Sequence, residues 1–172
     1  VFWVELVQAG GVDMRAHPLP LQTAAVANVV ADAPRRSVLC VEDNPANMML
    51  VARLLARRPD IQLLCAKDGR SGVEMAQAAM PEVILMDINL PGINGLTALK
   101  ILAGDPVTAH IPVIALSANA MPRDIEKGLQ AGFFRYLTKP IKIDEFMDTL
   151  DLALATSRPT PTPQSTLEDT PS

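Results

Sequence analysis

Acidic, hydroxyl and basic side chains follow four short apolar runs of this sequence, and their types suit phosphoryl chemistry. Glu42 and Asp43 are adjacent carboxylates after the first run, and Asp87 follows a later one. Neighbouring carboxylates repel one another and attract a cation, and an oxygen-rich set of this kind suits Mg²⁺. Beside such a cation, Asp87 can stay ionised as a nucleophile. The ammonium of Lys139 and the hydroxyl of Ser117 would hold a phosphoryl group on that carboxylate.

For these side chains to meet, the apolar runs before them must be strands of one sheet. Each run is too short for a helix and is bounded by turn or breaker residues. The five runs are Ser37–Val41, Ile61–Ala66, Val83–Met86, Val113–Leu116 and Phe133–Leu137. They are continuous rather than alternating, which is typical of parallel strands covered on both faces. Segments with helical spacing separate them, so the sequence predicts an α/β fold with a doubly wound, five-stranded parallel sheet and helices on both faces.

Ligands of such sheets bind beyond the carboxyl ends of the strands, which is where the polar residues stand. An acidic residue at a strand end can instead simply cap the next helix. Complementary chemistry at four strand ends favours one shared site over four separate caps.

Three apolar stripes at helical spacing predict helix faces that point into the core. The stripes are Met48, Val51, Leu54 and Leu55; Met121, Ile125 and Leu129; and Phe146, Leu150 and Leu154. Asn44 before Pro45 predicts a helix N-cap and first turn, and Gly132 predicts a helix end. Cys40 and Cys65 lie within apolar strands, so we expect both to be small core residues.

Four segments of the sequence resemble the signature of the receiver domain of two-component response regulators. They are Val38–Asn44 (VLCVEDN), Leu85–Gly95 (LMDINLPGING), Ala115–Ala118 (ALSA) and Tyr136–Pro140 (YLTKP). The segments occur in the family's order and spacing between residues 37 and 155. The resemblance implies a flavodoxin-like sheet with strand order 2-1-3-4-5.

The resemblance also implies roles for individual residues. Asp87 matches the phosphoacceptor of the family. Glu42 and Asp43 match the acidic pair that serves Mg²⁺, with Asp43 the more direct ligand and Glu42 acting through water. Asn89 matches the position whose backbone carbonyl completes the metal site. Lys139 matches the lysine of the catalytic site.

Three further expectations come from the resemblance. The peptide bond between Lys139 and Pro140 is expected to be cis. Ser117 and Tyr136 match the family's switch pair: on phosphorylation the hydroxyl moves toward the phosphoryl group and the ring turns inward. Glu42 and Ser117 stand where Asp and Thr are commoner in the family, which keeps the chemistry and affects its tuning.

The resemblance implies that the domain accepts a phosphoryl group from a phosphohistidine onto Asp87, with Mg²⁺ bound, and so switches the surface of the fourth helix and fifth strand. The expected partners are a histidine kinase phosphodonor domain, a histidine phosphotransfer protein, or both, and self-dephosphorylation is expected as a side activity. Two alternatives stay open: a regulatory interaction domain that gates its parent kinase by contact with little phosphotransfer, and a small hydrolase that uses the same carboxylates.

The flanking segments suggest a larger parent protein. Residues 1–7 resemble the last strand of a histidine kinase ATP-binding domain, and residues 8–36 have the composition of a linker. With a receiver domain at 37–155 and a disordered Pro/Thr/Ser-rich tail at 156–172, this order favours the C-terminal receiver of a hybrid sensor histidine kinase. Kinase ATP-binding motifs are absent from the 172 residues, so we expect no use of ATP by them.

The composition excludes several other classes. The net charge of −4 argues against a nucleic-acid-binding surface, which needs a basic patch. Two cysteines cannot form a disulfide framework, so we expect a reducing compartment. Because no apolar run approaches the roughly 20 residues of a membrane span, we expect a cytoplasmic domain that makes no membrane contact itself, whether or not its parent is membrane-anchored.

Overall fold

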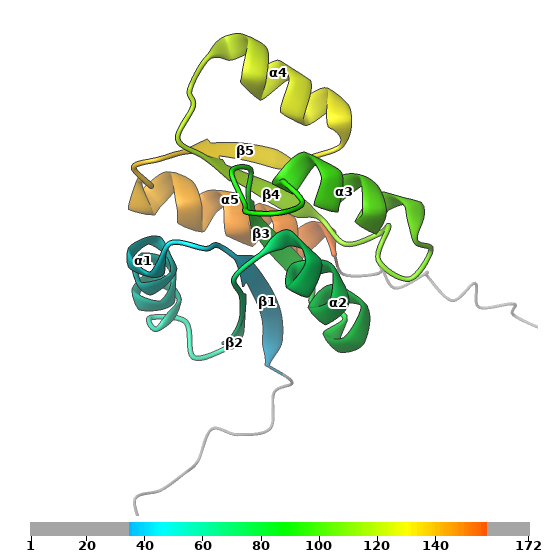
Figure 1. The fold of residues 1–172 in the computed structure, drawn as a ribbon. Helices are drawn as coiled ribbons and strands as arrows, with labels where there is room; N and C mark the ends of the chain where they lie inside the picture. Colours follow the sequence, from blue (N-terminus) through cyan, green and yellow to red (C-terminus); the bar gives the residue numbers. More distant parts are fainter. Residues whose placement is uncertain (1–34, 158–172) are drawn as a thin grey trace, which may run out of the picture. The chain divides into compact units, whose positions relative to one another are not determined.

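The computed structural model describes residues 35–157, and Figure 1 shows their fold. The five strands form one parallel sheet in the order β2-β1-β3-β4-β5. The strands are β1 (Arg36–Val41), β2 (Ile61–Ala66), β3 (Val83–Asp87), β4 (Val113–Ser117) and β5 (Arg135–Thr138). The helices are α1 (Pro45–Leu55), α2 (Gly69–Ala79), α3 (Gly95–Gly104), α4 (Pro122–Ala131) and α5 (Ile143–Thr156). The predicted fold class and strand order are confirmed.

Helices cover both faces of the sheet (Figure 1). On one face, α1 and α5 pack over the central strands and bury Phe146 and Leu150. On the other face, α2 and α3 cover Leu39, Ile84 and Met86, while α4 contacts α3 and β5. The central strands are buried from both sides, which is why their sequences are continuous apolar runs.

Local signals set most element ends where the sequence predicts them. Asn44 Oδ1 accepts a backbone hydrogen bond at 2.9 Å and caps α1. Gly132 adopts a φ of 114° at the end of α4, a conformation that favours glycine. The fifth strand begins at Arg135, two residues later than predicted. The backbone N–H of Phe133 closes the end of α4 by donating to Gly128 O at 3.2 Å, so Phe133 is not free to start the strand.

The edges of the predicted segments shift slightly. β1 begins at Arg36, the last residue of the predicted linker, and its N–H donates to Asp60 O at 2.8 Å. α5 ends at Thr156, one residue beyond the predicted domain 37–155. The predicted kinase remnant 1–7, the linker up to residue 34 and the tail from residue 158 lie outside the described residues. Between residues 35 and 157, no helix is both long enough and apolar enough to cross a membrane.

The prediction that the α4 stripe faces the core is wrong. Met121 is 64% exposed and Leu129 is 43% exposed, and Ile125 is half-buried. The buried position of this helix is Gly128, whose absent side chain leaves room for the ring of Tyr136: a Cβ at 128 would lie 2.8 Å from the ring. The helix packs through this glycine, and its apolar stripe faces outward.

The two cysteines differ, and only the prediction for Cys40 is confirmed. Cys40 lies on central strand β1 and is buried, whereas Cys65 lies on edge strand β2 and is exposed. It opens into a groove of about 510 Å³ that Met48 and Met49 of α1 line. An edge strand has a neighbour on one side only, and α1 leaves this part of it uncovered.

A thiol-specific reagent should therefore distinguish the two cysteines. We expect the folded protein to react with one equivalent of 5,5′-dithiobis(2-nitrobenzoate), at Cys65, and with a second equivalent only after unfolding. Loss of solvent contact raises the pKa of both thiols, even that of Cys65, which is only partly shielded. The reaction rate at Cys65 should therefore keep rising at pH values where an unperturbed cysteine is already ionised. The variant Cys65→Ser should not react while folded. Two fast equivalents from the folded wild type would contradict the burial of Cys40.

Candidate functional site

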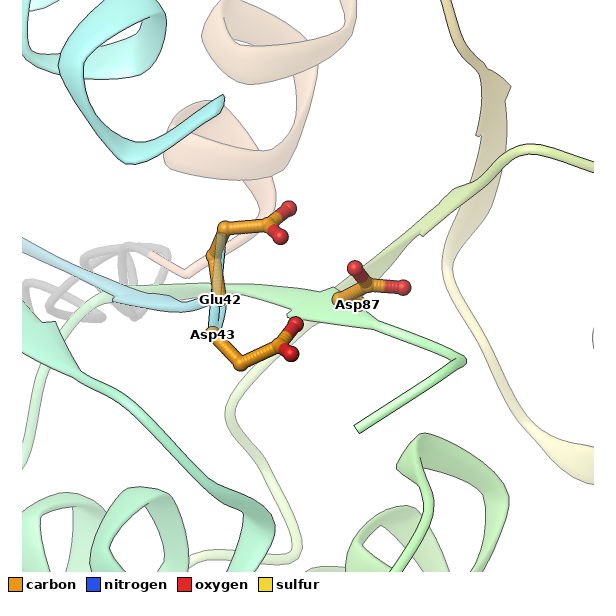
Figure 2. Close-up of side chains that lie close together, drawn as sticks. All are labelled: Glu42, Asp43 and Asp87. Carbon is orange, nitrogen blue, oxygen red and sulfur yellow. The ribbon is translucent and has the colours of Figure 1, made fainter. Parts of the chain in front are cut away.

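The carboxyl ends of two adjacent strands bring three carboxylates together (Figure 2). Glu42 and Asp43 follow β1, and Asp87 is the last residue of β3, which pairs with β1 in parallel. Each residue offers a carboxylate oxygen within 4.8 Å of those of the other two. Glu42 is 2% exposed and Asp87 is 4% exposed, while Asp43 is open to solvent. The site is thus two buried carboxylates with one accessible carboxylate at the rim.

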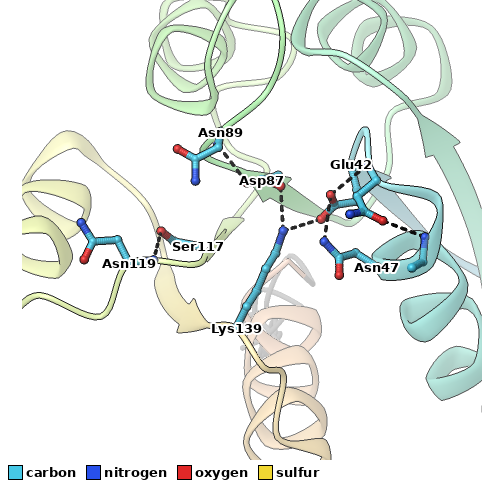
Figure 3. Close-up of polar contacts among 9 residues, drawn as sticks. Glu42, Asn47, Asp87, Asn89, Ser117, Asn119 and Lys139 are labelled. Atoms are coloured by element: carbon cyan, nitrogen blue, oxygen red, sulfur yellow. Dashed lines mark hydrogen bonds and ion pairs between the residues drawn. The ribbon is translucent and has the colours of Figure 1, made fainter.

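A lysine from the end of β5 reaches into this cluster (Figure 3). The backbone N–H of Lys139 donates to Ser117 O at 2.7 Å and fixes the start of the side chain. Its Nζ lies 2.7 Å from Glu42 Oε2 and 2.7 Å from Asp87 Oδ2. The peptide bond from Lys139 to Pro140 is cis, as the resemblance implies.

The charge state of Lys139 follows from these contacts. Burial by itself lowers the pKa of this ammonium, but the hydrogen bonds and charges of Asp87 and Glu42 outweigh burial, so the net pKa is raised. The amine therefore stays protonated at neutral pH. Three carboxylates and one ammonium leave a formal charge of −2 in the cluster. This charge and the all-oxygen donor set fit a hard divalent cation such as Mg²⁺.

The two buried carboxylates differ in the number of hydrogen bonds that they accept, three at Glu42 and two at Asp87. Glu42 has both oxygens occupied: Oε1 accepts from the backbone N–H of Asn44 at 3.1 Å and from Asn47 Nδ2 at 3.2 Å, and Oε2 accepts from Lys139. Asp87 Oδ1 accepts from the backbone N–H of Asn89 at 2.8 Å. Asn47 lies in the first turn of α1 and was missed by the sequence prediction; its place three residues after the N-cap was the available signal.

The predicted switch residues lie beside a cleft of about 220 Å³ at the end of β4. Ser117 is buried, and its Oγ accepts a hydrogen bond from the backbone N–H of Asn119 at 3.1 Å. Tyr136 is half-buried, and its hydroxyl donates to the backbone carbonyl of Asn119 at 3.4 Å. Ile88 and Asn89, the two residues that follow Asp87 in the chain, line the same cleft. The structure thus brings all seven predicted site residues to one edge of the sheet.

The loop after Asp87 depends on a close approach by Gly95, the first residue of α3. Its N–H donates to Ile88 O at 3.0 Å, and a Cβ at this position would lie 2.4 Å from Asp87 O. We expect Gly95→Ala to displace that backbone and to lower the free energy of unfolding by about 1–3 kcal/mol. In the matched variant Gly104→Ala, on the same helix, the new Cβ meets no atom within 4 Å. Urea denaturation of both variants checks this, and equal stabilities would contradict it.

Comparisons with known proteins agree with this geometry. A family model described as "Response regulator receiver domain" matches residues 38–151. The polar-differentiation response regulator DivK of Brucella anthropi is 39% identical over 115 residues, which are 67% of this chain and 93% of that protein.

Two solved structures show the same fold in receiver domains of kinases. One is the receiver domain of the sensor histidine kinase PA1611 from Pseudomonas aeruginosa, solved with a magnesium ion in its active site cleft. It is 34% identical to this chain with a TM-score of 0.64, and the match covers 70% of this chain and 98% of that one. The other is the signal receiver domain of a signal transduction histidine kinase from Syntrophus aciditrophicus. It is 27% identical with a TM-score of 0.66, and the match covers 73% of this chain and 94% of that one. Because the family model matches residues 38–151 and so reaches all five strands, this chain belongs to the response regulator receiver domains of two-component signalling.

Proposed function

We propose that the domain accepts a phosphoryl group from a phosphohistidine onto the carboxylate of Asp87. The observation that carries the proposal is the convergence of three carboxylates on one ammonium, with Lys139 Nζ 2.7 Å from Asp87 Oδ2. Receiver domains of this kind interact with histidine kinases or phosphotransfer proteins, so a donor of that class fits.

The transfer is a displacement at phosphorus. An oxygen of Asp87 attacks, an O–P bond forms, and the N–P bond of the phosphohistidine breaks, so the imidazole leaves with its electron pair. Lys139 neutralises negative charge that develops on the phosphoryl oxygens. The hydrogen bond from Asn89 N–H to Asp87 Oδ1 holds the carboxylate in one orientation during the attack.

We propose that Mg²⁺ is held by Asp43, Asp87 and the backbone carbonyl of Asn89. Glu42 would act on the ion through water. The hydrogen bonds support this division: Glu42 accepts three, two of them at Oε1, whereas each oxygen of Asp87 accepts only one and so keeps a lone pair for a cation. When bound, Mg²⁺ neutralises charge on the phosphoryl oxygens.

Ser117 and Tyr136 are the proposed switch pair. Ser117 Oγ would leave the N–H of Asn119 and donate to a phosphoryl oxygen, and the ring of Tyr136 would turn into the vacated space. The position of both residues on the cleft beside Asn89 supports this proposal. The exposed apolar stripe of α4 then lies on the surface that changes.

We also propose that the domain comes from the C-terminal part of a hybrid sensor histidine kinase in the cytoplasm. The composition of residues 1–36 and the similar receiver domains of two kinases support this origin. Residues 1–7 would then be a kinase remnant and residues 8–35 a linker to the receiver domain, which begins with β1 at Arg36.

Intact mass spectrometry tests the phosphoryl acceptance. After incubation with acetyl phosphate and Mg²⁺, we expect one phosphoryl adduct per chain, and none when EDTA replaces Mg²⁺. If neither acetyl phosphate nor a phosphorylated histidine kinase core yields an adduct, the proposal fails and gating of a parent kinase by contact becomes the better account.

A further inference from the structure

Asn119 is the centre of a hydrogen-bond network that joins the two switch residues to the first turn of α4. Its backbone N–H donates to Ser117 Oγ at 3.1 Å, and its backbone carbonyl accepts from the hydroxyl of Tyr136 at 3.4 Å. Its side-chain Oδ1 accepts from the N–H of Met121 at 3.1 Å, and its Nδ2 donates to Asp124 Oδ2. Figure 3 shows Asn119 beside Ser117, on the far side of Asp87 from Glu42.

The side-chain hydrogen bonds of Asn119 set the position of its backbone N–H and carbonyl. The hydrogen bonds to Met121 and Asp124 anchor the amide of Asn119 to the helix start, so its N–H and carbonyl stay aimed at Ser117 and Tyr136. α4 has no other side-chain cap, because its N-cap residue Met121 makes no side-chain hydrogen bond. Asp124 is therefore the acceptor that ties the loop after β4 to α4.

We propose that Asn119 and Asp124 are positioning residues that hold the unphosphorylated arrangement of the switch pair, and so set the free-energy cost of activation. The proposal rests on the proposed function, since it concerns the regulation of the same site. For Ser117 Oγ to reach a phosphoryl oxygen it must leave Asn119 N–H, and for the ring of Tyr136 to turn inward its hydroxyl must leave the carbonyl. An anchor that holds Asn119 in place favours the state before phosphorylation.

The variant Asp124→Ala removes the anchor and should shift the equilibrium toward the active arrangement. We expect its phosphorylation by acetyl phosphate to be about five-fold faster than that of the wild type, the fold-change that one net hydrogen bond of about 1 kcal/mol gives. Asn119→Ala should act in the same direction. Because both changes break the same contact between Asn119 and Asp124, the double variant should be no faster than the faster single variant.

Charge must be separated from anchoring, because loss of any carboxylate near Asp87 favours the addition of a phosphoryl group. Asp124→Asn removes the charge and keeps an oxygen that accepts from Asn119 Nδ2, so we expect a rate within about two-fold of the wild type. Glu126→Ala removes the same charge from an exposed position on α4, where its carboxylate contacts only Gln130 among the described residues. It should also leave the rate unchanged.

A second measurement reads the switch directly. Tyr136 is the single tyrosine of the chain, so 3-fluorotyrosine labelling gives one ¹⁹F resonance. In unphosphorylated Asp124→Ala this resonance should move toward its position in the phosphorylated wild type, while Asp124→Asn and Glu126→Ala keep the wild-type position.

The outcomes separate the two proposals. A wild-type adduct together with unchanged rate and resonance in Asp124→Ala overturns the positioning role alone. Equal acceleration in Asp124→Ala, Asp124→Asn and Glu126→Ala also overturns it, in favour of a charge effect. A wild type that takes up no phosphoryl group overturns the proposed function, and the ¹⁹F resonance of unphosphorylated Asp124→Ala still decides whether the network holds Tyr136.

Discussion

Replacing Asp87 with Asn should abolish the uptake of phosphoryl groups completely. The amide oxygen of Asn is a far weaker nucleophile than a carboxylate. Glu42 is the one other described carboxylate that contacts Lys139, and it accepts three hydrogen bonds where Asp87 accepts two. We therefore expect no adduct from acetyl phosphate or from a phosphorylated kinase, as measured by intact mass. Phosphorylation should not move to Asp43, because Asp43 lies at the exposed rim and makes no ion pair with Lys139.

A matched control is Asp148→Asn, which makes the same chemical change at an exposed position of α5. It should be phosphorylated at the wild-type rate. The fold of Asp87→Asn should persist, since its Oδ1 can still accept from the N–H of Asn89. A full adduct on folded Asp87→Asn would show that another residue is the acceptor.

Replacing Lys139 with Met should have the second largest effect, on both reaction and stability. Without the ammonium, no positively charged side chain among the described residues contacts Glu42 Oε2 or Asp87 Oδ2. We expect phosphorylation to slow by about a hundred-fold or more, the usual cost of losing one group that stabilises developing charge. We also expect the free energy of unfolding, measured in EDTA, to fall by about 2–3 kcal/mol, less than the 3–5 kcal/mol of a fully buried pair because Lys139 keeps some solvent contact.

The sign of the pH dependence distinguishes this account from a simple packing defect. The raised pKa of Lys139 means that its stabilisation is fully present below the pKa of an unfolded lysine, and is lost as pH rises through the folded value. The wild type should therefore lose stability above about pH 10.4, and Lys139→Met should lack that alkaline step. A difference in stability between wild type and Lys139→Met that is constant between pH 7 and pH 11 would contradict the ionic role.

Much of the site could be predicted because parallel strands all end at one edge of the sheet. The short apolar runs predict the bounds of four of the five strands to within one residue, and this is enough to place Asp87 and Lys139 at the same edge of the sheet. The N-cap at Asn44 and the helix end at Gly132 were predictable for the same reason: both depend on local residue chemistry.

The errors share a physical cause, because periodicity shows that a helix or strand has an apolar side and not what covers it. The stripe through Met121 has core spacing, yet α4 packs through Gly128 against Tyr136. Cys65 lies in a segment with the composition of a core strand, but it is exposed because that strand is at the edge of the sheet. The network at Asn119 could not be predicted from the sequence either. In two of its four hydrogen bonds Asn119 takes part only through its backbone N–H or carbonyl, which every residue type except proline offers.

The most direct test of the central claim is to locate the phosphoryl group on the chain. Borohydride reduces an aspartyl phosphate to homoserine, so treatment after incubation with acetyl phosphate and Mg²⁺, followed by peptide mass spectrometry, identifies the acceptor. The account predicts homoserine at position 87 and unmodified aspartate at position 43. A phosphate that survives borohydride on Ser117, or a reduced carboxyl at a residue other than Asp87, would contradict it.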